Sequence, residues 1–324
     1  MIKYKKIAIT IGDPTGIGPE IIIKSINSLD IPAKEYILIG NKEIFHKVSS
    51  KINQPLPDNL DIIDIPCDIS KISAGQPNIE SGKLSYLALK KACQLAQNNE
   101  IRAIVTAPLS KEAINMAGYH YSGQTEILQD YLGNKNEQAE MLFVARDFRV
   151  LLLTRHIPLK DVPQALTQDK IINTILALNK SLTKDFNTIK PRLAVCGLNP
   201  HAGENGLLGT EEQEIIIPAI NKLKEKYNIN IEGPFPADTM WNKAAKPYIE
   251  ENPQPYQAYV ACYHDQGLIP IKLLAMDFTV NMTINLPIIR TSPSHGTAFD
   301  IASKNIANYN SMKEAIDLAY SISV

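Results

Sequence analysis

The sequence predicts an α/β protein built around a largely parallel sheet. Short apolar runs rich in β-branched residues alternate along the chain with longer amphipathic segments, and this alternation is typical of βαβ units. The apolar runs show little period-2 alternation, as expected for strands that helices cover on both faces. The chain has 324 residues, a length that suggests two domains.

Seven apolar runs are predicted as buried strands, because each is short and ends in turn residues. They are KIAITIG (6–12), EYILIG (35–40), LDIIDI (60–65), AIVTAP (103–108), RVLLLT (149–154), RLAVCGL (192–198) and AYVACY (258–263). Apolar residues at i, i+3, i+4 spacing predict helices over 80–100 and 210–227. Residues 278–292 read as one long extended segment or two, followed by a Gly turn and a helix over 297–307.

The composition argues against nucleic-acid and membrane partners. The chain carries 33 basic and 34 acidic residues, with a net charge of −1 and no basic block. No apolar run approaches the ~18 residues of a membrane span, and the stretch Ile7–Ile11 is too short for a signal peptide. The four cysteines form no CxxC motif, which argues against a disulfide framework. We therefore expect a cytoplasmic protein.

Three of the six histidines come just after predicted strands. His156 follows RVLLLT, His201 follows RLAVCGL, and His264 follows AYVACY. Ligands of open α/β sheets bind at the carboxyl edge, and imidazole is the commonest transition-metal ligand. Histidines at strand ends also serve in turns, and these spacings match no local zinc motif. The pattern alone therefore leaves open both a shared metal site and three structural histidines.

Two glycine-rich stretches follow the first and the last predicted strands in the sequence. GDPTGIGPE (12–20) follows the first strand and opens a helix, but it does not match GxGxxG, so a well-capped turn explains it equally well. SPSHGTAFD (292–300) precedes the predicted last helix. Backbone N–H groups at a helix start suit an anion or the edge of a cofactor. N-capping by Thr297 is the simpler alternative.

Several polar residues interrupt apolar surroundings and are candidates for anion binding. Lys272, Asn281 and Arg290 each lie beside a strand-like run. Surface exposure is the default for Lys and Arg, but Arg binds phosphate or carboxylate bidentately, which favours a ligand role for Arg290. Gln124 and Thr125 stand just before a predicted helix, where they indicate an N-cap or a phosphate-binding turn.

Taken together, these stretches resemble a known family. They resemble the 4-hydroxythreonine-4-phosphate dehydrogenase family of pyridoxal phosphate biosynthesis. The stretches that carry the resemblance are GDPTGIGPE, TAPLSKEAI, LLLTRHIPLKDVP, CGLNPHAGENGLLGTEE, GPFPADTMW and ACYHDQGLIPIK with the segment that follows it. The matching stretches run in order from residue 6 to about residue 320. The first and last are also similar to the GDGIGPE and HGSAPDIAGK stretches of isopropylmalate and isocitrate dehydrogenases. The resemblance implies their two-domain α/β/α fold, with a cleft between the domains.

The resemblance also implies a homodimer whose active site is shared with the partner subunit. We expect residues 1–125 and 282–324 to form a first, discontinuous α/β domain, and residues 126–281 to form a second one with the dimer interface.

By the same resemblance, each candidate residue acquires a role. A divalent metal (Zn²⁺, Co²⁺ or Mg²⁺) is held by His156, His201 and His264. The substrate is bound by Gln124, Thr125, Lys272, Asn281 and Arg290. NAD or NADP lies against His295, Gly296, Thr297 and Asp300. Asp265 and Asp238 are candidate catalytic residues, as orienters of a metal-bound histidine or as proton relays.

The implied reaction is a metal-dependent oxidation of 4-(phosphooxy)-L-threonine by NAD or NADP. The product, 2-amino-3-oxo-4-(phosphooxy)butanoate, loses CO₂ to give 3-amino-2-oxopropyl phosphate, a precursor of pyridoxine 5′-phosphate. Two departures from the family pattern stand out: Gln124 replaces the usual His, and Ser303 replaces the usual Gly. Phosphorylated threonate or erythronate therefore stay open as substrates. A metal-dependent lyase or acyltransferase, or a non-catalytic binding protein, are the alternatives from other classes.

Overall fold

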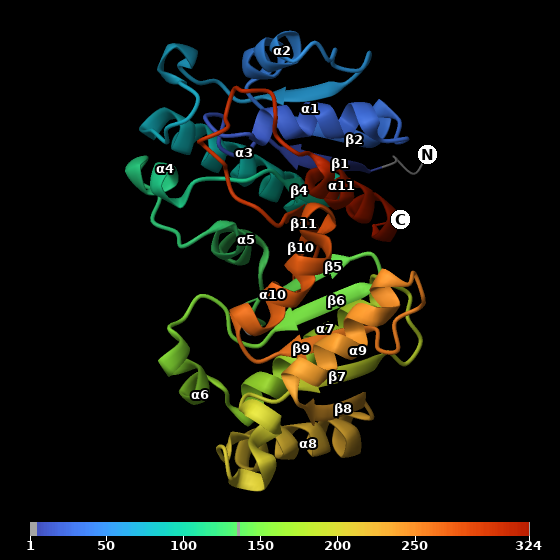
Figure 1. Cartoon of the computed structure of the whole chain (residues 1–324). Coiled ribbons are helices and arrows are strands. Elements are labelled where there is room, and N and C mark those ends of the chain that lie inside the picture. Colours follow the sequence, from blue (N-terminus) through green and yellow to red (C-terminus); the bar gives the residue numbers. More distant parts are fainter. Residues whose placement is uncertain (1–4, 135–136, 324) are drawn as a thin grey trace. The chain divides into compact units, whose positions relative to one another are not determined.

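The chain folds into two compact α/β units, which confirms the predicted fold class. The computed structural model describes residues 5–134 and 137–323. The first unit comprises Met1–Ala139 and Val280–Val324, and the second comprises Glu140–Thr279 (Figure 1). The expected second domain, residues 126–281, is longer at both ends than this second unit, which spans Glu140–Thr279.

The first unit contains a mixed, mostly parallel sheet with the strand order β3-β2-β1-β4-β11-β10. The strands are β1 (Lys6–Thr10), β2 (Tyr36–Gly40), β3 (Asp61–Asp64), β4 (Ile101–Thr106), β10 (Val280–Ile284) and β11 (Ile289–Pro293). All neighbours pair in parallel except β10 and β11, which are antiparallel. The last two strands return from the far end of the sequence and place β11 beside β4.

Two groups of helices pack on this sheet. Helix α1 contacts α2 and α11, whereas α3 contacts α4 and α5. The helices are α1 (Gly18–Ser28), α2 (Lys42–Lys51), α3 (Ile79–Gln97), α4 (Lys111–Met116), α5 (Gln124–Leu132) and α11 (Asn310–Ile322), with short 3₁₀ turns at Ala33–Glu35 and Ile69–Lys71. Helix α3 begins with a capping box between Asn78 and Ser81, which fixes its start.

The second unit has the strand order β5-β6-β9-β7-β8. Its strands are β5 (Glu140–Ala145), β6 (Phe148–Leu152), β7 (Arg192–Cys196), β8 (Asn230–Phe235) and β9 (Ala258–Ala261). Only β5 is antiparallel to its neighbour. Its helices are α6 (Val162–Ala165), α7 (Gln168–Lys184), α8 (Ile217–Tyr227), α9 (Ala237–Ile249) and α10 (His264–Ala275), with short helical turns at Leu159–Asp161, Pro200–Gly206, Glu212–Ile216 and Met276–Phe278. Helix α7 packs on α8, and α9 packs on α10.

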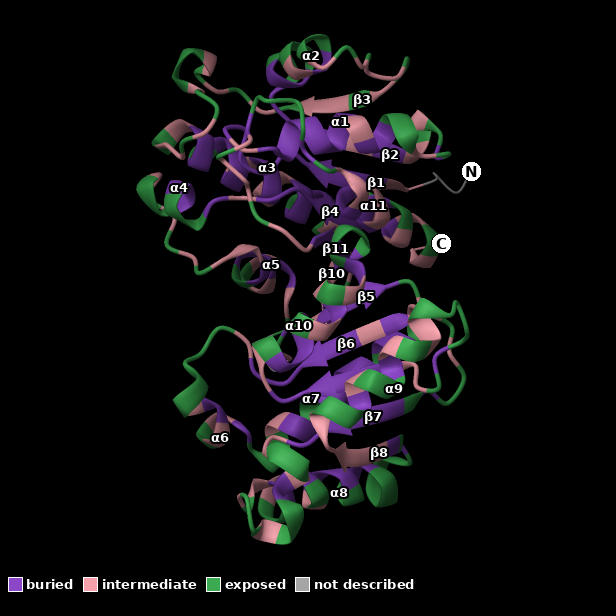
Figure 2. Cartoon of the chain, viewed as in Figure 1, coloured by how far each residue is buried: buried purple, intermediate pink, exposed green. Residues whose placement is uncertain are grey.

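The central strands of both units are buried, as Figure 2 shows. In the second unit the core includes Phe148, whose ring lies edge-on to Tyr259 at 5.5 Å, with Trp241 packed against the cluster. Because these strands are buried, they fix the positions of the residues that come directly after their carboxyl ends. Within the described residues, no helix is long and apolar enough to cross a membrane.

The structure also corrects parts of the predicted order. All seven predicted strands form, and residues 278–292 fold back as two antiparallel strands. The predicted helix over 297–307 was wrong: this segment consists of turns, because Ala298, Ser303 and Asn305 have φ values of 45°, 67° and 62° that no right-handed helix accepts. Lys272 lies in helix α10 and not beside a strand.

Candidate functional site

The three strand-end histidines follow three strands that are neighbours in one sheet. His156 comes after β6, His264 after β9 and His201 after β7, and β9 pairs in parallel with both of the others. Parallel strands end at the same edge, so the sheet directs all three toward the side where α/β proteins bind ligands. The sequence pattern anticipated this placement.

His156 and His264 lie close enough to act together. Their ring centroids are 5.6 Å apart with an interplanar angle of 48°. Nδ1 of His264 is hydrogen-bonded to Oδ1 of Asp265 at 2.7 Å. This contact leaves Nε2 of His264 for a ligand, and a carboxylate behind an imidazole is the usual support of a metal-bound histidine.

His201 does not join them in this structure. It lies in the Pro200–Gly206 segment, where residues 201–205 all have left-handed backbone angles. Its side chain is 70% exposed and lies 3.9 Å from the carboxylate of Glu204. Across residues 5–134 and 137–323, no three His, Cys, Asp or Glu side chains are grouped as a metal site requires.

The donor types nevertheless fit a divalent cation. Imidazole nitrogens suit Zn²⁺ or Co²⁺, and an added carboxylate or substrate oxygen would suit Mg²⁺. The histidine pair with its Asp265 support supplies two such donors, and a third requires rearrangement of the loop that carries His201. Joint ligation by the three histidines stays a prediction.

A buried glutamate that the sequence reading missed anchors this loop. Oε1 of Glu212 accepts hydrogen bonds from the backbone N–H groups of Leu198 and Asn199 at 2.8 and 2.7 Å, and Oε2 accepts one from Nδ2 of Asn199 at 3.0 Å. Glu212 is almost fully buried. It therefore holds the entrance of the loop in place while the segment around His201 stays at the surface. No local sequence signal marks Glu212, because its burial and its partners depend on the closure of this loop.

In the first unit, Arg290 forms a buried cationic site. It is only 2% exposed, and its hydrogen-bond partners are neutral oxygens. Nη1 donates to Oγ1 of Thr283 at 2.9 Å, and Nη2 donates to Oγ1 of Thr106 and Oε1 of Gln124, both at 2.6 Å. Burial lowers the pKa of Arg290 to about 10, and Glu126 opposes this shift. The guanidinium therefore stays charged at neutral pH.

A buried guanidinium without a carboxylate in contact is costly unless an anion joins it. Thr106 and Thr283 complete this site, and the sequence reading named neither. Thr283 lies two residues from Asn281 on the same strand, so the two share one face of the sheet. That period-2 relation was a signal available in the sequence.

Gln124 and Thr125 lie in the first turn of α5 and not before it, because the N-cap is Gly123 with no side-chain hydrogen bond. Both polar atoms of the Gln124 amide are hydrogen-bonded. Oε1 accepts from Arg290, and Nε2 donates to the backbone carbonyl of Ala107 at 3.1 Å. Thr125, the next residue in the sequence, is buried. Backbone N–H groups of this first turn add positive potential.

The remaining candidates occupy separate positions. Asn281 lies on β10, where its buried Oδ1 has no hydrogen-bond partner within the described chain. Lys272 is a residue of α10 in the second unit. Asp238 and Asp265 are both exposed, in the first turns of α9 and α10, and Asp265 contacts the candidate metal ligand His264.

The loop expected to hold the nicotinamide cofactor packs against the loop after β1. The backbone N–H of Ile17 donates to the carbonyl of Thr297 at 3.0 Å. A Cβ on Gly16 would lie 2.6 Å from that same oxygen, so this approach requires glycine. By contrast, a Cβ on Gly296 would meet no atom within 4 Å, which leaves room beside the backbone for a flat ligand. The residues of this loop thus fit a cofactor edge.

Comparison with known proteins identifies the relatives of this chain. It is 43% identical over 338 residues to the 4-hydroxythreonine-4-phosphate dehydrogenase of Nostoc, covering 98% of this chain and 93% of that one. It is 40% identical over 331 residues to the Synechocystis protein of the same name, covering 97% and 94%. The crystal structure of 4-hydroxythreonine-4-phosphate dehydrogenase from Klebsiella pneumoniae superposes with a TM-score of 0.86 at 35% identity, covering 99% of this chain and 100% of that one. A family profile, pyridoxal phosphate biosynthetic protein PdxA, matches residues 12–319. The chain belongs to this PdxA family.

Proposed function

We propose that the chain catalyses the oxidation of 4-(phosphooxy)-L-threonine to 2-amino-3-oxo-4-(phosphooxy)butanoate, which decarboxylates to 3-amino-2-oxopropyl phosphate. Family membership makes the chain an oxidoreductase of pyridoxal phosphate biosynthesis. The observation that carries the substrate assignment is the buried Arg290, whose hydrogen-bond partners are all neutral. Such a site accepts a phosphate or carboxylate of a small substrate.

The residues of the first unit bind and orient the anionic group. Arg290 supplies the charge, and Thr106 and Thr283 fix the plane of the guanidinium through its two terminal nitrogens. Thr125 and the first turn of α5 add hydrogen-bond donors. Asn281 presents a buried carbonyl oxygen that suits the amino group of the substrate.

The residues of the second unit would hold a divalent cation, Zn²⁺, Co²⁺ or Mg²⁺. His156, His201 and His264 would be its protein ligands, and Asp265 orients His264. When bound, such a cation acts as a Lewis acid that lowers the pKa of a substrate hydroxyl group. Lys272 adds positive charge toward the acidic substrate. Asp265 is our choice for the catalytic support role because it is hydrogen-bonded to His264, and Asp238, in the first turn of α9, is the weaker one.

The loop formed by His295, Gly296, Thr297 and Asp300 would hold NAD or NADP, which would supply the hydride acceptor. Support comes from the open space beside the backbone of Gly296. Turns replace the predicted helix here. The loop therefore offers backbone groups and side chains to the cofactor and not a helix dipole.

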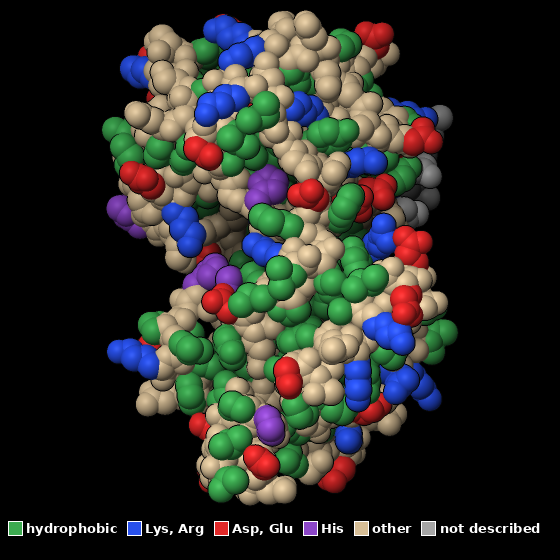
Figure 3. Space-filling view, in the orientation of Figure 1, with side chains coloured by type: hydrophobic (Ala, Val, Ile, Leu, Met, Phe, Trp, Pro, Cys, Tyr) green, Lys and Arg blue, Asp and Glu red, His purple; other side chains and the backbone are tan. Residues whose placement is uncertain are grey.

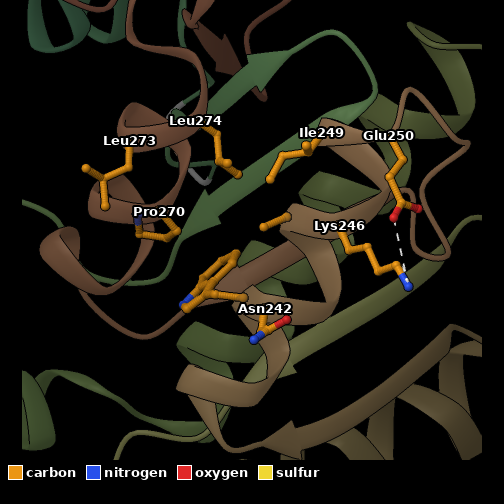
Figure 4. Close-up of a pocket in the computed structure, with 9 residues that line it drawn as sticks. Asn242, Lys246, Ile249, Glu250, Pro270, Leu273 and Leu274 are labelled. Carbon is orange, nitrogen blue, oxygen red and sulfur yellow. Dashed lines mark ion pairs between the residues drawn. The ribbon is translucent and has the colours of Figure 1, made fainter.

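We assign the assembly as a cytoplasmic homodimer that associates through the second unit. A groove of about 570 Å³ lies between α9 and α10, lined by Trp241, Ile249, Pro270, Leu273 and Leu274 among others (Figure 4). Ile249 and Leu273 are 68% and 82% exposed. Hydrophobic side chains gather over α10 in the space-filling view (Figure 3). Apolar patches of this kind with charged pairs at the rim, here Lys246 and Glu250, are typical of homodimer interfaces.

A coupled assay tests the function. The purified protein is mixed with 4-(phosphooxy)-L-threonine, NAD or NADP, and Zn²⁺, Co²⁺ or Mg²⁺, with a chelator control. Metal-dependent reduction of the cofactor with the amino substrate is the expected result. Reduction only with 4-phospho-threonate or 4-phospho-erythronate would move the chain to a sugar-acid dehydrogenase. No reduction with any of these substrates and all three metals would contradict the dehydrogenase assignment.

A further inference from the structure

Hydrogen bonds connect the ends of the three neighbouring strands that lead to the histidines. The residues that come after β6, β9 and β7, shortly before these histidines, are Thr154, Cys262 and Gly197. The backbone carbonyl of Cys262 accepts from the backbone N–H of Thr154 at 3.1 Å and from its Oγ1 at 2.7 Å. The end of β6 is therefore held against the end of β9.

On its other side, the end of β9 is connected to β7 through the side chain of Gln266, in the first turn of α10. Oε1 of Gln266 accepts from the backbone N–H of Cys262 at 2.7 Å, and its Nε2 donates to the backbone carbonyl of Gly197 at 2.8 Å. The backbone pairing of β7 and β9 extends to Val195 and Val260. The amide of Gln266 thus continues the hydrogen bonding beyond the end of this pairing.

Close packing of α10 on the sheet fixes this amide. Gln266 is buried, with 9% of its surface exposed. A Cβ on the next residue, Gly267, would lie 2.6 Å from Cδ2 of Leu152 and 3.0 Å from Cβ of Ala261. Only glycine therefore allows α10 to begin so close to β6 and β9. A side-chain amide donates and accepts at the same time, so it satisfies a buried N–H and a buried carbonyl together.

The connection continues from Gly197 into the loop that carries His201. The next two backbone N–H groups, those of Leu198 and Asn199, both donate to Oε1 of Glu212. A Cβ on Gly197 would lie 3.2 Å from that same oxygen. Because the start of the loop is packed this tightly, the position of Gly197 determines where the loop begins.

We propose that Gln266 is a positioning residue of the metal site, which fixes the start of the His201 loop against the strand end that leads to His264. Thr154 fixes the strand end that leads to His156 in the same way. The inference rests on the proposed function, because the three histidines are metal ligands only in that proposal. Gln266 acts through the backbone groups of its two neighbours, as outer residues do when they set the geometry in which metal ligands meet.

The test measures the affinity of the full-length protein, prepared without metal, for Zn²⁺ and Co²⁺ by competition with a chelating dye. Gln266→Met keeps the approximate volume of the side chain and removes both hydrogen bonds. It is expected to weaken metal binding by about tenfold or more.

Gln254→Met is the matched control. Gln254 is similarly buried in the same unit, and its amide also makes two hydrogen bonds: Oε1 accepts from the hydroxyl of Tyr259 at 2.8 Å, and Nε2 donates to the carbonyl of Ala244 at 3.1 Å. The two variants should lower the melting temperature to a similar extent. Gln254→Met should leave the metal affinity unchanged.

A double-mutant cycle separates positioning from general destabilisation. In the background of His201→Ala the loop carries no ligand, so Gln266→Met should then cost less than about twofold in metal affinity. Equal losses in the two backgrounds would show that Gln266 stabilises the unit without positioning His201, and would overturn the inference.

Thr154→Val is the milder second variant. It removes the hydrogen bond from Oγ1 and keeps the one from the backbone N–H. We expect about a threefold loss of metal affinity, and near-wild-type affinity in Thr154→Ser, which keeps the hydroxyl. Wild-type affinity in both Gln266→Met and Thr154→Val would overturn the inference and leave the metal site in place.

Two other outcomes concern the proposed function. A wild-type protein that binds none of Zn²⁺, Co²⁺ and Mg²⁺ would contradict the metal site, and the inference with it. Weakened metal binding in Gln266→Met, in a protein that reduces neither NAD nor NADP with any of the proposed substrates, would contradict the dehydrogenase assignment alone.

Discussion

Gln124 holds Arg290 with its amide oxygen, at 2.6 Å from Nη2, while its amide nitrogen is held by the carbonyl of Ala107. The glutamine is thus a neutral strut between strand β4's end and the buried guanidinium. It orients the cation without neutralising it. Both its amide oxygen and its amide nitrogen are hydrogen-bonded to protein atoms. In the proposed function, the charge that meets the anionic group of the substrate therefore comes from Arg290 and not from Gln124.

Replacing this strut with an acid tests the anion site. Gln124→Glu puts a carboxylate at hydrogen-bond distance from Nη2 of Arg290. The new ion pair competes with the substrate, so kcat/KM and the affinity for inorganic phosphate should each fall by about tenfold or more. Gln129→Glu on the same helix, where the Gln129 side chain contacts the backbone of Asn134, Glu137 and Ala139, is the control. Unchanged phosphate affinity in Gln124→Glu would show that Arg290 does not bind the anion.

The pH dependence of anion binding reports the charge of Arg290. Sulfate is a suitable probe because its own charge is constant over this range. Its affinity should be flat from about pH 6 to 9 and should decrease as the pH rises through the Arg290 pKa of about 10. In Gln124→His, a new step should appear near pH ~6.5, with tighter binding on the acid side where the imidazole is charged. A step of that kind in the wild-type protein would contradict the assignment of Arg290 as the group whose charge governs anion binding.

Asp265 should matter for metal binding and Asp238 should not. Asp265 holds Nδ1 of His264, and loss of such a support costs about 10–100-fold in metal affinity. We expect this loss in Asp265→Ala and substantial recovery in Asp265→Asn, because an amide oxygen still accepts from the ring N–H. Competition with a chelating dye measures both variants. Asp238→Ala is the control, and equal losses in the two alanine variants would argue against specific support by Asp265.

The α9–α10 groove should control the oligomeric state. Leu273→Lys places a charge at its most exposed lining leucine, and burying that charge without a partner should weaken the dimer by about 100-fold or more. Sedimentation velocity over a concentration series measures this change. Leu159→Lys, at another exposed leucine of the second unit, should leave the dimer intact. A dimer equally stable in both variants would place the interface elsewhere.

The buried carboxylate of Asp13 should limit stability at neutral pH. Burial raises its pKa despite hydrogen bonds from Thr15 and Ser81, so the folded state holds this proton more tightly than the unfolded chain. Its stabilising contribution is complete below the ordinary carboxyl pKa and is lost as the pH rises through the raised value. Asp13→Asn keeps an acceptor for Thr15 and should raise the melting temperature at pH ~7 by about 2–4 °C.

The same measurement at acid pH provides the internal control, because the gain from Asp13→Asn should vanish there. Asp68→Asn should behave in the opposite way: hydrogen bonds from Ser70 lower the pKa of Asp68, so its contribution is present at neutral pH and is lost as the pH falls. A destabilised Asp13→Asn at neutral pH would mean that the charged form is needed for the fold.

Local pattern predicted most of the strands because burial on both faces leaves an unbroken apolar run. Of the strands that escaped prediction, β8 lacks that signature, whereas β5 has it in the run MLFVA after Glu140. Strand β8, NIEGPF, is a polar edge strand with Gly and Pro, and β5 begins with the buried Glu140. The absent helix over 297–307 had a helical pattern, but left-handed angles at Ala298, Ser303 and Asn305 break it. Such angles follow from tertiary contacts that no local pattern contains.

Candidate site residues at strand ends could be predicted from the sequence. Candidate site residues that meet only through the pairing of strands distant in the sequence could not. Histidines after β6, β9 and β7 could be read from the sequence, because parallel strands end at one edge. The hydrogen-bond partners of Arg290 could not be read from the sequence, because Thr106 and Gln124 become its neighbours only when β11 pairs with β4. The same reason explains why Glu212 was missed, since its role depends on the closure of a loop.

The discontinuity of the first unit also sets an order of events during synthesis. Residues 140–279, the entire second unit, leave the ribosome before β10 and β11 exist outside it. Domains fold as they emerge, so the second unit and its row of histidines can fold while the first sheet still ends at β4. Strand β11 then docks beside β4 and carries Arg290 into its buried position. Arg290, the cation of the proposed anion site, thus reaches its buried position only after the whole second unit has left the ribosome.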